Sequence, residues 1–196
     1  MERILVAGAG LAGSEAALQL ADRGFKVDLF EMRPGVMTPA HETGFPAELV
    51  CSNSLRSNQL HNAPGLLKEE LRRAGSYLIR AADETSVPAG GALAVDRMLF
   101  SGRVLGMLES KAAITIHRQE LREIPSGRTV IAAGPLMSSA LSREVSGLTG
   151  EEHLHFHDAI APIVSAESLD MNRIFLQDRY GETGKGDYLN CPMTEQ

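Results

Sequence analysis

Apolar and polar positions near the N-terminus follow the periods of a strand, a helix and a second strand. Four apolar residues at 4–7 predict a short buried parallel strand, and the apolar spacing over 11–21 predicts a helix that packs back on it. The run 26–30 predicts the return strand. A strand, a helix and a second strand in this order predict the first unit of a parallel α/β sheet.

Periodicity is lost between residues 32 and 64, where four prolines interrupt the chain. This segment follows the C-terminal end of the second predicted strand, which is where doubly wound sheets hold their ligands. A long irregular segment at such a place is typical of a functional or mobile region. Beyond it, a helix is predicted over 66–74, with Asn62 as its cap, Pro64 near its first turn and Gly75 at its exit.

The middle of the chain predicts one further helix and several short strands. Residues 77–79 are typical of a short strand, and 87–95 of a glycine-opened turn that leads to Asp96. Asp96 caps the predicted helix. The buried face of this helix is supplied by Leu99, Phe100, Val104, Leu105 and Leu108. Residues 113–117 predict a strand, and 129–135 predict a buried strand that ends in a glycine turn.

From Ser138 onward the pattern becomes richer in strands. Ser138 caps a short predicted helix that reaches Val145, and Gly147 and Gly150 bracket the loop after it. Three strand-like runs follow, at 153–160, 163–166 and 173–177. We therefore predict a doubly wound, Rossmann-like α/β domain over 1–137 and the beginning of a second, β-richer domain over 138–196.

The composition is that of an ordinary globular protein, with 43% hydrophobic and 22% charged residues in a chain of 196. No apolar run approaches the length that crosses a bilayer, so we expect no membrane association and a cytoplasmic location. The net charge of -6 argues against a dominant phosphate-binding surface but permits a local basic patch for an RNA. The chain stops without a closing element, and we expect it to be a fragment of a longer protein.

A glycine-rich turn joins the first predicted strand to the first predicted helix. Gly8 permits the tight turn, Gly10 lacks a Cβ that would block a pyrophosphate, and Gly13 lets helix and strand approach closely. Glu31, at the end of the second strand, is placed to accept both hydroxyls of an adenosine ribose and disfavours the extra phosphate of NADP. The pattern predicts a site for FAD or NAD, and the alternative is a doubly wound domain without a nucleotide.

The candidate cofactor-binding residues come from this turn and from two strand ends. They are Gly8, Ala9, Gly10, Leu11, Ala12, Gly13, Glu31 and Gly134. Gly134 ends a predicted strand, where a glycine suits a second close approach to the nucleotide, although such a glycine more often only terminates a strand.

Two cysteines are the candidate catalytic residues, and a reducing compartment favours free thiols over a disulfide. Cys51 lies among hydrogen-bonding side chains in the irregular segment, yet its apolar neighbours Leu49 and Val50 are typical of a packed residue. Cys191 precedes Pro192 in a stiff turn, and its spacing alone indicates a structural role. The residues by themselves leave catalytic and structural roles open for both thiols.

A metal site and an RNA-binding helix are the less favoured interpretations of two other clusters. His153, His155 and His157 alternate along a predicted strand but spread over about 13 Å, too far for one ion, so we predict no metal site. The second cluster is cationic and consists of Lys68, Arg72, Arg73 and Arg80. Because Glu69 and Glu70 lie among these cations, a solvated helix surface is favoured over contact with RNA.

Several blocks of unusual composition extend well beyond the glycine turn. They are GAGLAGSE at 8–15, FEMRP at 30–34, MTPAH at 37–41, CSNSL at 51–55, PAGGALAVDR at 88–97, DA at 158–159 with APIV at 161–164, and DYLNCPMT at 187–194. In content and order these blocks resemble the bacterial family of folate- and FAD-dependent tRNA (uracil-5-)-methyltransferases, TrmFO. The resemblance covers essentially the whole chain.

This resemblance implies a tRNA-modifying flavoenzyme that makes 5-methyluridine in the T loop. It implies 5,10-methylenetetrahydrofolate as the carbon donor, FAD as the bound cofactor and NAD(P)H as the source of reducing equivalents. It also implies roles for Cys51 and Cys191, one adding to C6 of uracil and the other serving proton transfer or flavin protection, with Cys191 favoured for the addition. Members of the family are longer, and Ala133 stands where they often carry threonine.

Two other functions remain open at this point. One is an FAD-dependent oxidoreductase or a tRNA-binding flavoprotein without methyl transfer, such as a protein resembling the tRNA-uridine carboxymethylaminomethyl modification subunit. The other is an inactive nucleotide-binding fragment. The blocks around Cys51 and Cys191 favour methyl transfer, because hydride transfer has no need of thiols in these settings.

Overall fold

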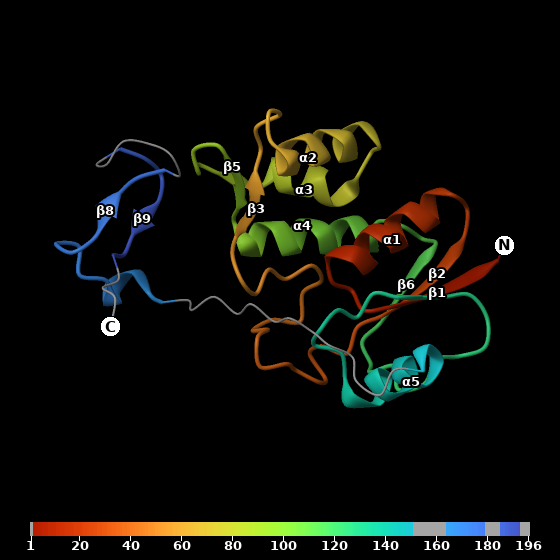
Figure 1. The fold of residues 1–196 in the computed structure, drawn as a ribbon. Helices are drawn as coiled ribbons and strands as arrows, with labels where there is room; N and C mark the ends of the chain where they lie inside the picture. The colour runs from red at the N-terminus through yellow and green to blue at the C-terminus, as the bar shows by residue number, and fades with distance from the viewer. Residues whose placement is uncertain (1, 151–163, 179–184, 193–196) are drawn as a thin grey trace.

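A four-stranded parallel sheet forms the centre of the molecule (Figure 1). The computed structural model describes residues 2–150, 164–178 and 185–192. The strands of this sheet are β1 (Arg3–Ala7), β2 (Lys26–Phe30), β6 (Ile114–His117) and β7 (Thr129–Ile131), in the order β6-β2-β1-β7. Because β1 lies between β2 and β7, its C-terminal end opens beside the ends of both neighbours.

Helices cover both faces of this sheet. The helices of the described residues are α1 (Leu11–Asp22), α2 (Ala63–Arg73), α3 (Tyr77–Glu84), α4 (Arg97–Glu109) and α5 (Ser139–Thr149), of which α2 packs on α3 and β3. Figure 1 shows α1, α3 and α4 on one side of the sheet and α5 on the other. The predicted strand–helix–strand unit at the N-terminus is confirmed, and so is the α/β class with a parallel sheet.

Two small antiparallel sheets accompany the central one. β3 (Ser54–Ser57), β5 (Ala92–Val95) and β4 (Ser86–Val87) form one in the order β3-β5-β4, and β8 (Phe175–Leu176) pairs with β9 (Leu189–Asn190) in the other. A short 3-10 helix at Ala166–Ser168 precedes β8. The carboxylate of Asp187 accepts a hydrogen bond of 2.6 Å from the backbone N–H of Gly90, which joins the β8–β9 pair to the turn before β5.

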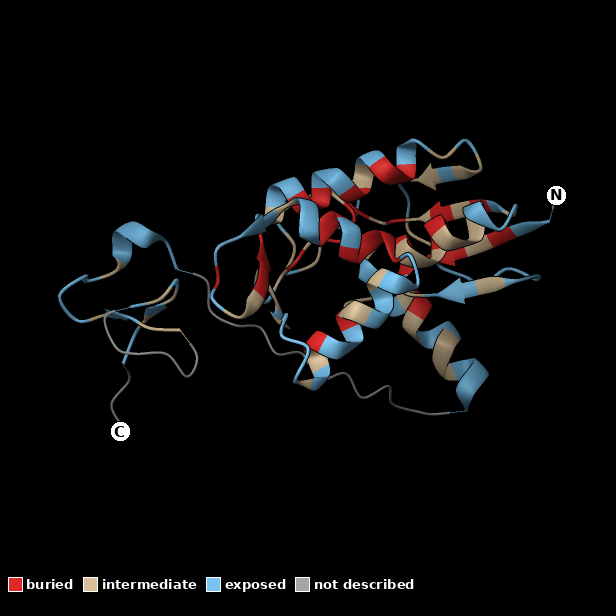
Figure 2. Ribbon diagram, turned by 90° about the horizontal axis from the view of Figure 1, so that it is seen from above, coloured by how far each residue is buried: buried red, intermediate tan, exposed pale blue. Residues whose placement is uncertain are grey.

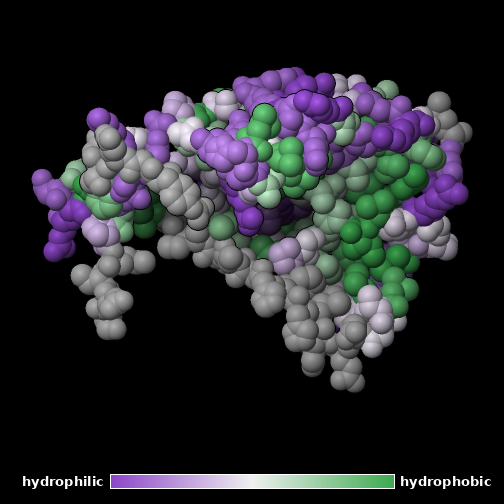
Figure 3. Space-filling model, turned by 45° about the horizontal axis from the view of Figure 1, so that its top comes forward, coloured by the Kyte–Doolittle hydropathy of each residue, from purple (hydrophilic) through white to green (hydrophobic). Residues whose placement is uncertain are grey.

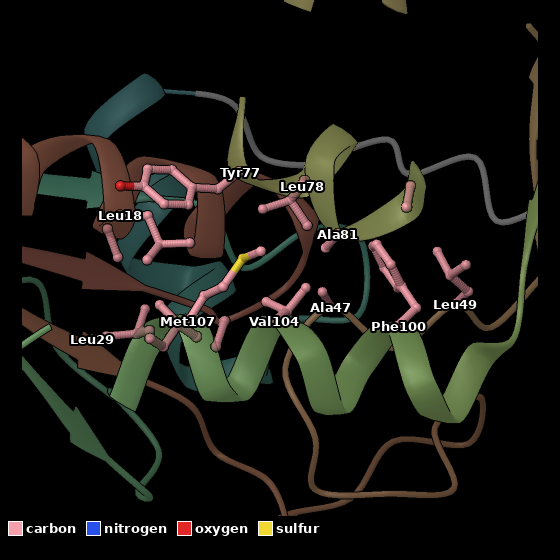
Figure 4. Packing of buried hydrophobic residues seen from close by; sticks show 14 of the residues in the cluster. Leu18, Leu29, Ala47, Leu49, Tyr77, Leu78, Ala81, Phe100, Val104 and Met107 are labelled. Atoms are coloured by element: carbon pink, nitrogen blue, oxygen red, sulfur yellow. The ribbon is translucent and has the colours of Figure 1, made fainter. Parts of the chain in front are cut away.

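The hydrophobic core fills the space between the sheet and the helices on its α1 side (Figure 4). Leu18 of α1, Leu29 of β2 and Phe100 of α4 are fully buried there. Ala47 and Leu49 of the irregular segment pack into the same cluster. In Figure 2 the buried residues gather along the inner sides of the helices and the central strands. The irregular segment is therefore anchored to the core just before Cys51.

A side chain of α1 caps the N-terminus of α3. The carboxylate of Glu15 accepts hydrogen bonds from Tyr77 N (3.2 Å), Leu78 N (2.8 Å) and the Ser76 hydroxyl (3.0 Å). Ser76 also caps the helix by accepting from Ile79 N at 3.3 Å. The strand predicted at 77–79 is wrong, because these caps start a helix whose apolar residues all turn towards the core.

Three other predictions in the first 110 residues need correction. The segment 32–64 is not wholly irregular, since it contains β3, and the turn predicted at 87–95 contains β5. Asp96 caps α4 as expected, accepting from Met98 N and Leu99 N. Leu99 itself is 62% exposed and Leu105 is only partly buried, and Met107 is buried on this helix instead.

The later elements also differ in detail from the predictions. β7 is at an edge of the sheet among the described residues, so Val130 and Ile131 are more than a third exposed rather than buried. Helix α5 is capped by Ser138 as predicted but continues through Gly147 to Thr149, with Gly150 as its C-cap. Within the predicted strand 163–166, Ala166 starts a 3-10 helix, and only 175–176 of the run 173–177 pair as a strand. The run 153–160 lies outside the described residues.

Neither a membrane span nor a metal cluster occurs in the part of the chain that the structure describes. No helix there is both long and apolar enough to cross a bilayer. No group of three or more histidine, cysteine, aspartate or glutamate side chains there is placed to hold a metal ion. His153, His155 and His157 lie outside the described residues.

Candidate functional site

The three glycines of the first turn have different surroundings. A Cβ on Gly13 would lie 1.8 Å from the carbonyl oxygen of Gly8, and a Cβ on Gly8 would lie 2.7 Å from the carbonyl oxygen of Ala132. Gly8 also has a φ of +96°, which L-residues rarely adopt. A Cβ on Gly10 would meet nothing within 4 Å. Two glycines therefore close the turn, and Gly10 leaves space in front of it.

This space is part of a cleft at the C-terminal ends of β1 and β2. Its lining includes Gly8, Gly10 and Glu31, which we call its floor, and Arg33, Thr38 and His41 of the irregular segment, which we call its wall. The lining also includes Glu120, Leu121, Ala133 and Leu136. Gly10 is the N-cap residue of α1, so the helix presents its first backbone N–H groups at this place, and such groups favour a diphosphate.

Glu31 is buried at the end of β2 and carries several hydrogen bonds. It is 5% exposed, and its Oε2 accepts from Ala9 N at 3.1 Å. Its Oε1 accepts from the backbone N of Arg33 at 3.0 Å and from Arg33 Nε at 2.9 Å. Burial by itself would raise the pKa of Glu31, but the hydrogen bonds from Arg33 and Ala9 outweigh it and hold that pKa below its usual value. Glu31 is therefore a carboxylate at neutral pH.

Arg33 links Glu31 to the irregular segment. Its guanidinium is only 3% exposed and donates from Nη1 to Glu48 Oε2 at 2.9 Å. Glu48 in turn accepts from Glu42 N at 2.8 Å and from the Thr43 hydroxyl at 2.7 Å. The cleft wall is thus held by a buried ion network of two carboxylates and one guanidinium.

His41 is the remaining ionisable group on this wall. Its Nδ1 lies 2.6 Å from the hydroxyl of Thr38, and both side chains line the cleft. Burial lowers the pKa of His41, and the charge of Arg33 lowers it further. A ring with a lowered pKa is neutral at physiological pH, so it can exchange hydrogen bonds with a ligand without adding charge.

The second predicted glycine contact, at the end of β7, also faces open space. Gly134 has a φ of +67°, and a Cβ there would meet nothing within 4 Å. Ala133 lines the cleft directly. The backbone N of Ala132 donates to Ala7 O at 2.8 Å, which fixes this turn beside the first glycine turn. The structure therefore brings Gly134 to the same edge of the sheet as Gly8 to Gly13.

Cys51 and Cys191 are both exposed free thiols, so Cys51 is not the packed residue that its apolar neighbours suggest. Two bonds tie the segment after Cys51 to the strand before α4: Val95 N donates to Asn53 O at 2.9 Å, and Asn53 Nδ2 donates to Val95 O at 3.1 Å. Cys191 follows β9 on the pair that Asp187 joins to Gly90. The two thiols thus belong to different elements.

The cations on α2 and α3 are engaged within the protein. Lys68 is buried and donates to Ser57 O and Pro64 O at 2.8 and 2.9 Å. Arg72 pairs with Asp83 at 2.7 Å, and Arg73 pairs with Glu69 at 3.0 Å. Figure 3 shows mostly hydrophilic residues on the upper surface, with a smaller hydrophobic patch among them. This arrangement favours the solvated helix surface over an RNA-binding face.

Three residues on the wall of the cleft were not predicted as site residues, and neither was the carboxylate that pairs with one of them. They are Arg33, Thr38, His41 and Glu48, in a segment where polar residues and prolines are dense. The one available signal was Arg33 itself, which follows the acidic residue by two positions and so returns to the same face of the chain.

The protein has a parallel sheet, an open glycine turn at a helix N-terminus and a buried acidic residue at the end of the next strand. These features define the class of Rossmann-like α/β proteins with a dinucleotide-binding turn. Comparison with known sequences gives the particular family. A profile of the family described as glucose inhibited division protein A matches residues 3–196, and the chain belongs to this family.

Two similar proteins match the whole length of this chain and share one name. The chain is 56% identical over 196 residues to a protein of Exiguobacterium sibiricum and 58% identical over 196 residues to one of Lactobacillus delbrueckii, both named methylenetetrahydrofolate--tRNA-(uracil-5-)-methyltransferase TrmFO. These matches confirm the resemblance to TrmFO. The chain covers 45% and 44% of those two proteins, so it spans a little under half of their length.

A solved structure supports the fold alone. The GidA protein of Aquifex aeolicus matches with a TM-score of 0.51 and 19% sequence identity, over 64% of this chain and 20% of that one. This likeness agrees with the Rossmann-like architecture derived from the sheet order.

Proposed function

We propose that this chain forms the FAD-binding part of an enzyme that methylates C5 of uridine in the T loop of tRNA with 5,10-methylenetetrahydrofolate. The observation that carries the proposal is the identity of 56–58% with proteins named for this reaction over 196 residues. The proposed substrate would place the protein in the cytoplasm. A flavoprotein without methyl transfer is the second candidate, because the cleft alone would serve either function.

The cleft fits an adenine dinucleotide. The empty space in front of Gly10 leaves room for a diphosphate against backbone N–H groups, and a Cβ would occupy that space. Ala9, Leu11, Ala12 and Gly13 complete the turn, Glu31 is placed for the ribose, and Gly134 offers a second close backbone approach. When bound, FAD supplies the electrons for methyl formation and takes them from NAD(P)H.

The thiols would supply the nucleophile. A thiolate adds to C6 of uracil, which makes C5 nucleophilic enough to take the carbon unit. A base then removes the C5 proton, and the thiolate leaves from C6. Overall, uridine, methylenetetrahydrofolate and reduced FAD give 5-methyluridine, tetrahydrofolate and FAD. We assign these roles to Cys51 and Cys191, one as nucleophile and one in proton transfer or flavin protection, with Cys191 favoured as the nucleophile.

A chimaera tests the proposal. The corresponding N-terminal segment of the Exiguobacterium protein is replaced by this chain, and the purified chimaera is incubated with labelled methylenetetrahydrofolate, NAD(P)H and a tRNA transcript. We expect a flavin absorption spectrum and label in 5-methyluridine. A chimaera that binds FAD and oxidises NAD(P)H without labelling tRNA would establish the second candidate instead.

Substitution of the thiols tests their roles in the same chimaera. Cys51→Ala and Cys191→Ala are each expected to abolish labelling of tRNA while FAD stays bound, because neither thiol lies in the glycine turn. A transcript with 5-fluorouridine at the target position should trap the attacking thiol, since fluorine cannot leave as the proton does. Peptide mapping then identifies the thiol, and full activity of either alanine variant removes that cysteine from the mechanism.

A further inference from the structure

Arg33 forms hydrogen bonds with several groups of the candidate site, and no sequence motif predicted them. Its side chain donates to both oxygens of Glu31, from Nε to Oε1 at 2.9 Å and from Nη2 to Oε2 at 3.2 Å. It also donates from Nη1 to Glu48 and, at 3.4 Å, to Thr43 O. The residue is 2% exposed yet lines the cleft. A guanidinium in this place controls the geometry of the carboxylate beside it.

The hydrogen bonds on Glu31 indicate which of its oxygens is held less tightly. A carboxylate has about four lone-pair positions, and all are used: two by Arg33 on Oε1, and one each by Ala9 N and Arg33 Nη2 on Oε2. The two bonds to Oε2 are the longer ones, at 3.1 and 3.2 Å. A ribose hydroxyl would therefore share Oε2 with Arg33, while the bonds to Oε1 keep the carboxylate oriented.

We propose that Arg33 is a positioning residue, which orients the Glu31 carboxylate for the ribose of the nucleotide and, through Glu48, ties that carboxylate to the segment leading to Cys51. The proposal rests on the nucleotide-binding part of the proposed function and not on methyl transfer. Glu48 lies three residues before Cys51, and its carboxylate holds the backbone of Glu42 and Thr43. Arg33 thus connects the nucleotide floor with the segment that carries a candidate thiol.

Because charged groups surround Glu31, the pH dependence of nucleotide binding tests whether Arg33 keeps Glu31 ionised. Besides Arg33, the ionisable groups around Glu31 are His41, Glu48 and Glu120, which also lines the cleft and is paired with Arg122. Without the guanidinium, the backbone bonds from Ala9 N and Arg33 N would remain, but burial would meet less opposition and shift Glu31 towards its neutral form. A neutral carboxyl offers a ribose fewer acceptors, so binding would then weaken as pH falls.

FAD is the probe for this experiment, because its diphosphate diester does not titrate between about pH 5.5 and 8. In the protein as it is, we expect a dissociation constant independent of pH over this range. Arg33→Met should weaken binding at least about tenfold and add a dependence in which binding weakens towards low pH, by at most about tenfold per pH unit for one proton. Arg33→Lys, which restores a cation, should restore the flat profile. A flat profile in Arg33→Met would overturn the proposal.

Two further variants locate the titrating group. In Arg33→Met combined with Glu31→Gln, His41 and Glu48 are retained, so a loss of the pH dependence assigns it to Glu31. Persistence of the dependence would contradict the proposal. Arg3→Met is the matched control, since Arg3 pairs with Asp28 at 2.7 Å away from the cleft, and its FAD binding should equal that of the unaltered protein. If the unaltered protein binds no FAD, both this proposal and the nucleotide part of the proposed function fail.

Hydrogen exchange tests the link to the irregular segment. Bound FAD should slow amide exchange in the glycine turn and also at Glu42 and Thr43, whose N–H groups donate to Glu48. In Glu48→Gln the protection of the glycine turn should remain, while that of Glu42 and Thr43 is lost. Equal protection of both regions in this variant would show that Arg33 does not couple them, whatever the outcome of the methylation assay.

Discussion

At the scale of single residues, the glycines of the first turn separate folding from ligand binding. Gly13 is required because a Cβ would lie 1.8 Å from a backbone oxygen, whereas Gly10 borders empty space. Gly10 has a φ of -68°, which any residue adopts, so the conformation of the turn does not demand a glycine there. Only a ligand that approaches the backbone closely gives this position a reason to lack a side chain.

We therefore predict opposite outcomes for two alanine substitutions. Gly13→Ala should destabilise the protein by about 2 kcal/mol or more, because the turn or α1 must move to accept the methyl group. Gly10→Ala should cost less than about 1 kcal/mol of unfolding free energy, as expected at a helix N-cap, yet weaken FAD binding. Urea denaturation and FAD titration of both variants measure the difference. Unchanged FAD affinity in Gly10→Ala would place the diphosphate elsewhere.

Much at this scale follows from local sequence. Asn62, Asp96 and Ser138 were predicted as caps and are caps, since a cap depends on residues within one turn. The glycine turn and Glu31 were likewise placed by spacing. Arg33 was missed as a site residue because its importance depends on Glu48, 15 residues further along a segment without periodicity. Contacts of that kind leave no pattern in a sequence.

At the scale of elements, the contact between α1 and α3 depends on one carboxylate. Glu15 projects from α1 and accepts the N–H groups of Tyr77 and Leu78, which have no partner inside α3. An isolated helix of eight residues would be marginal in water. This is why 77–79 was predicted as a strand, since its apolar run is ambiguous without the remote cap.

Removing that carboxylate should loosen α3. We predict that Glu15→Ala lowers the free energy of unfolding by about 2 kcal/mol, within the range for hydrogen bonds to a charged group. Glu69→Gln is the matched control, because Glu69 pairs only with arginines on the surface of its own helix, and such pairs contribute about 0.5 kcal/mol or less. Urea denaturation compares the two variants, and equal losses would refute the capping role of Glu15.

At the scale of the whole molecule, the parallel sheet was the most predictable feature and its surface the least. The parallel class followed from the alternation of strands and a helix, because a strand–helix–strand unit closes in one way. The exposure of β7 could not be predicted from the sequence, because the apolar run Val130–Ile131 resembles an interior strand. Its exposure depends on the position of β7 at the edge of the sheet among the described residues. The run 153–160 and the two-domain division stay predictions.

Acid should destabilise this molecule through its paired carboxylates. Burial would raise the pKa of Asp28, but hydrogen bonds from Arg3 and His117 lower it overall, and the pKa of Glu31 is lowered by Arg33. A carboxyl whose pKa is lower in the folded than in the unfolded state stabilises the fold at pH values above its unfolded pKa of about 4. This stabilisation is lost as the pH falls through the folded-state pKa.

Accordingly, the urea midpoint should be level from about pH 8 to 5.5 and fall below about pH 4. Asp28→Asn should flatten part of this fall, because one paired carboxylate no longer titrates. Glu109→Gln, at an exposed position on α4, is the control and should leave the curve unchanged. An Asp28→Asn curve that parallels the original would show that Asp28 does not contribute to acid sensitivity.

The buried network of Glu31, Arg33 and Glu48 has one further consequence, for ionic strength. Two anions and one cation sum to a single negative charge beneath the cleft, so long-range attraction cannot recruit an anionic nucleotide. Any phosphate held there must rely on short-range backbone dipoles, which dissolved ions screen little. Added salt should accordingly leave nucleotide affinity almost constant, in contrast to sites that gather phosphates with lysine side chains.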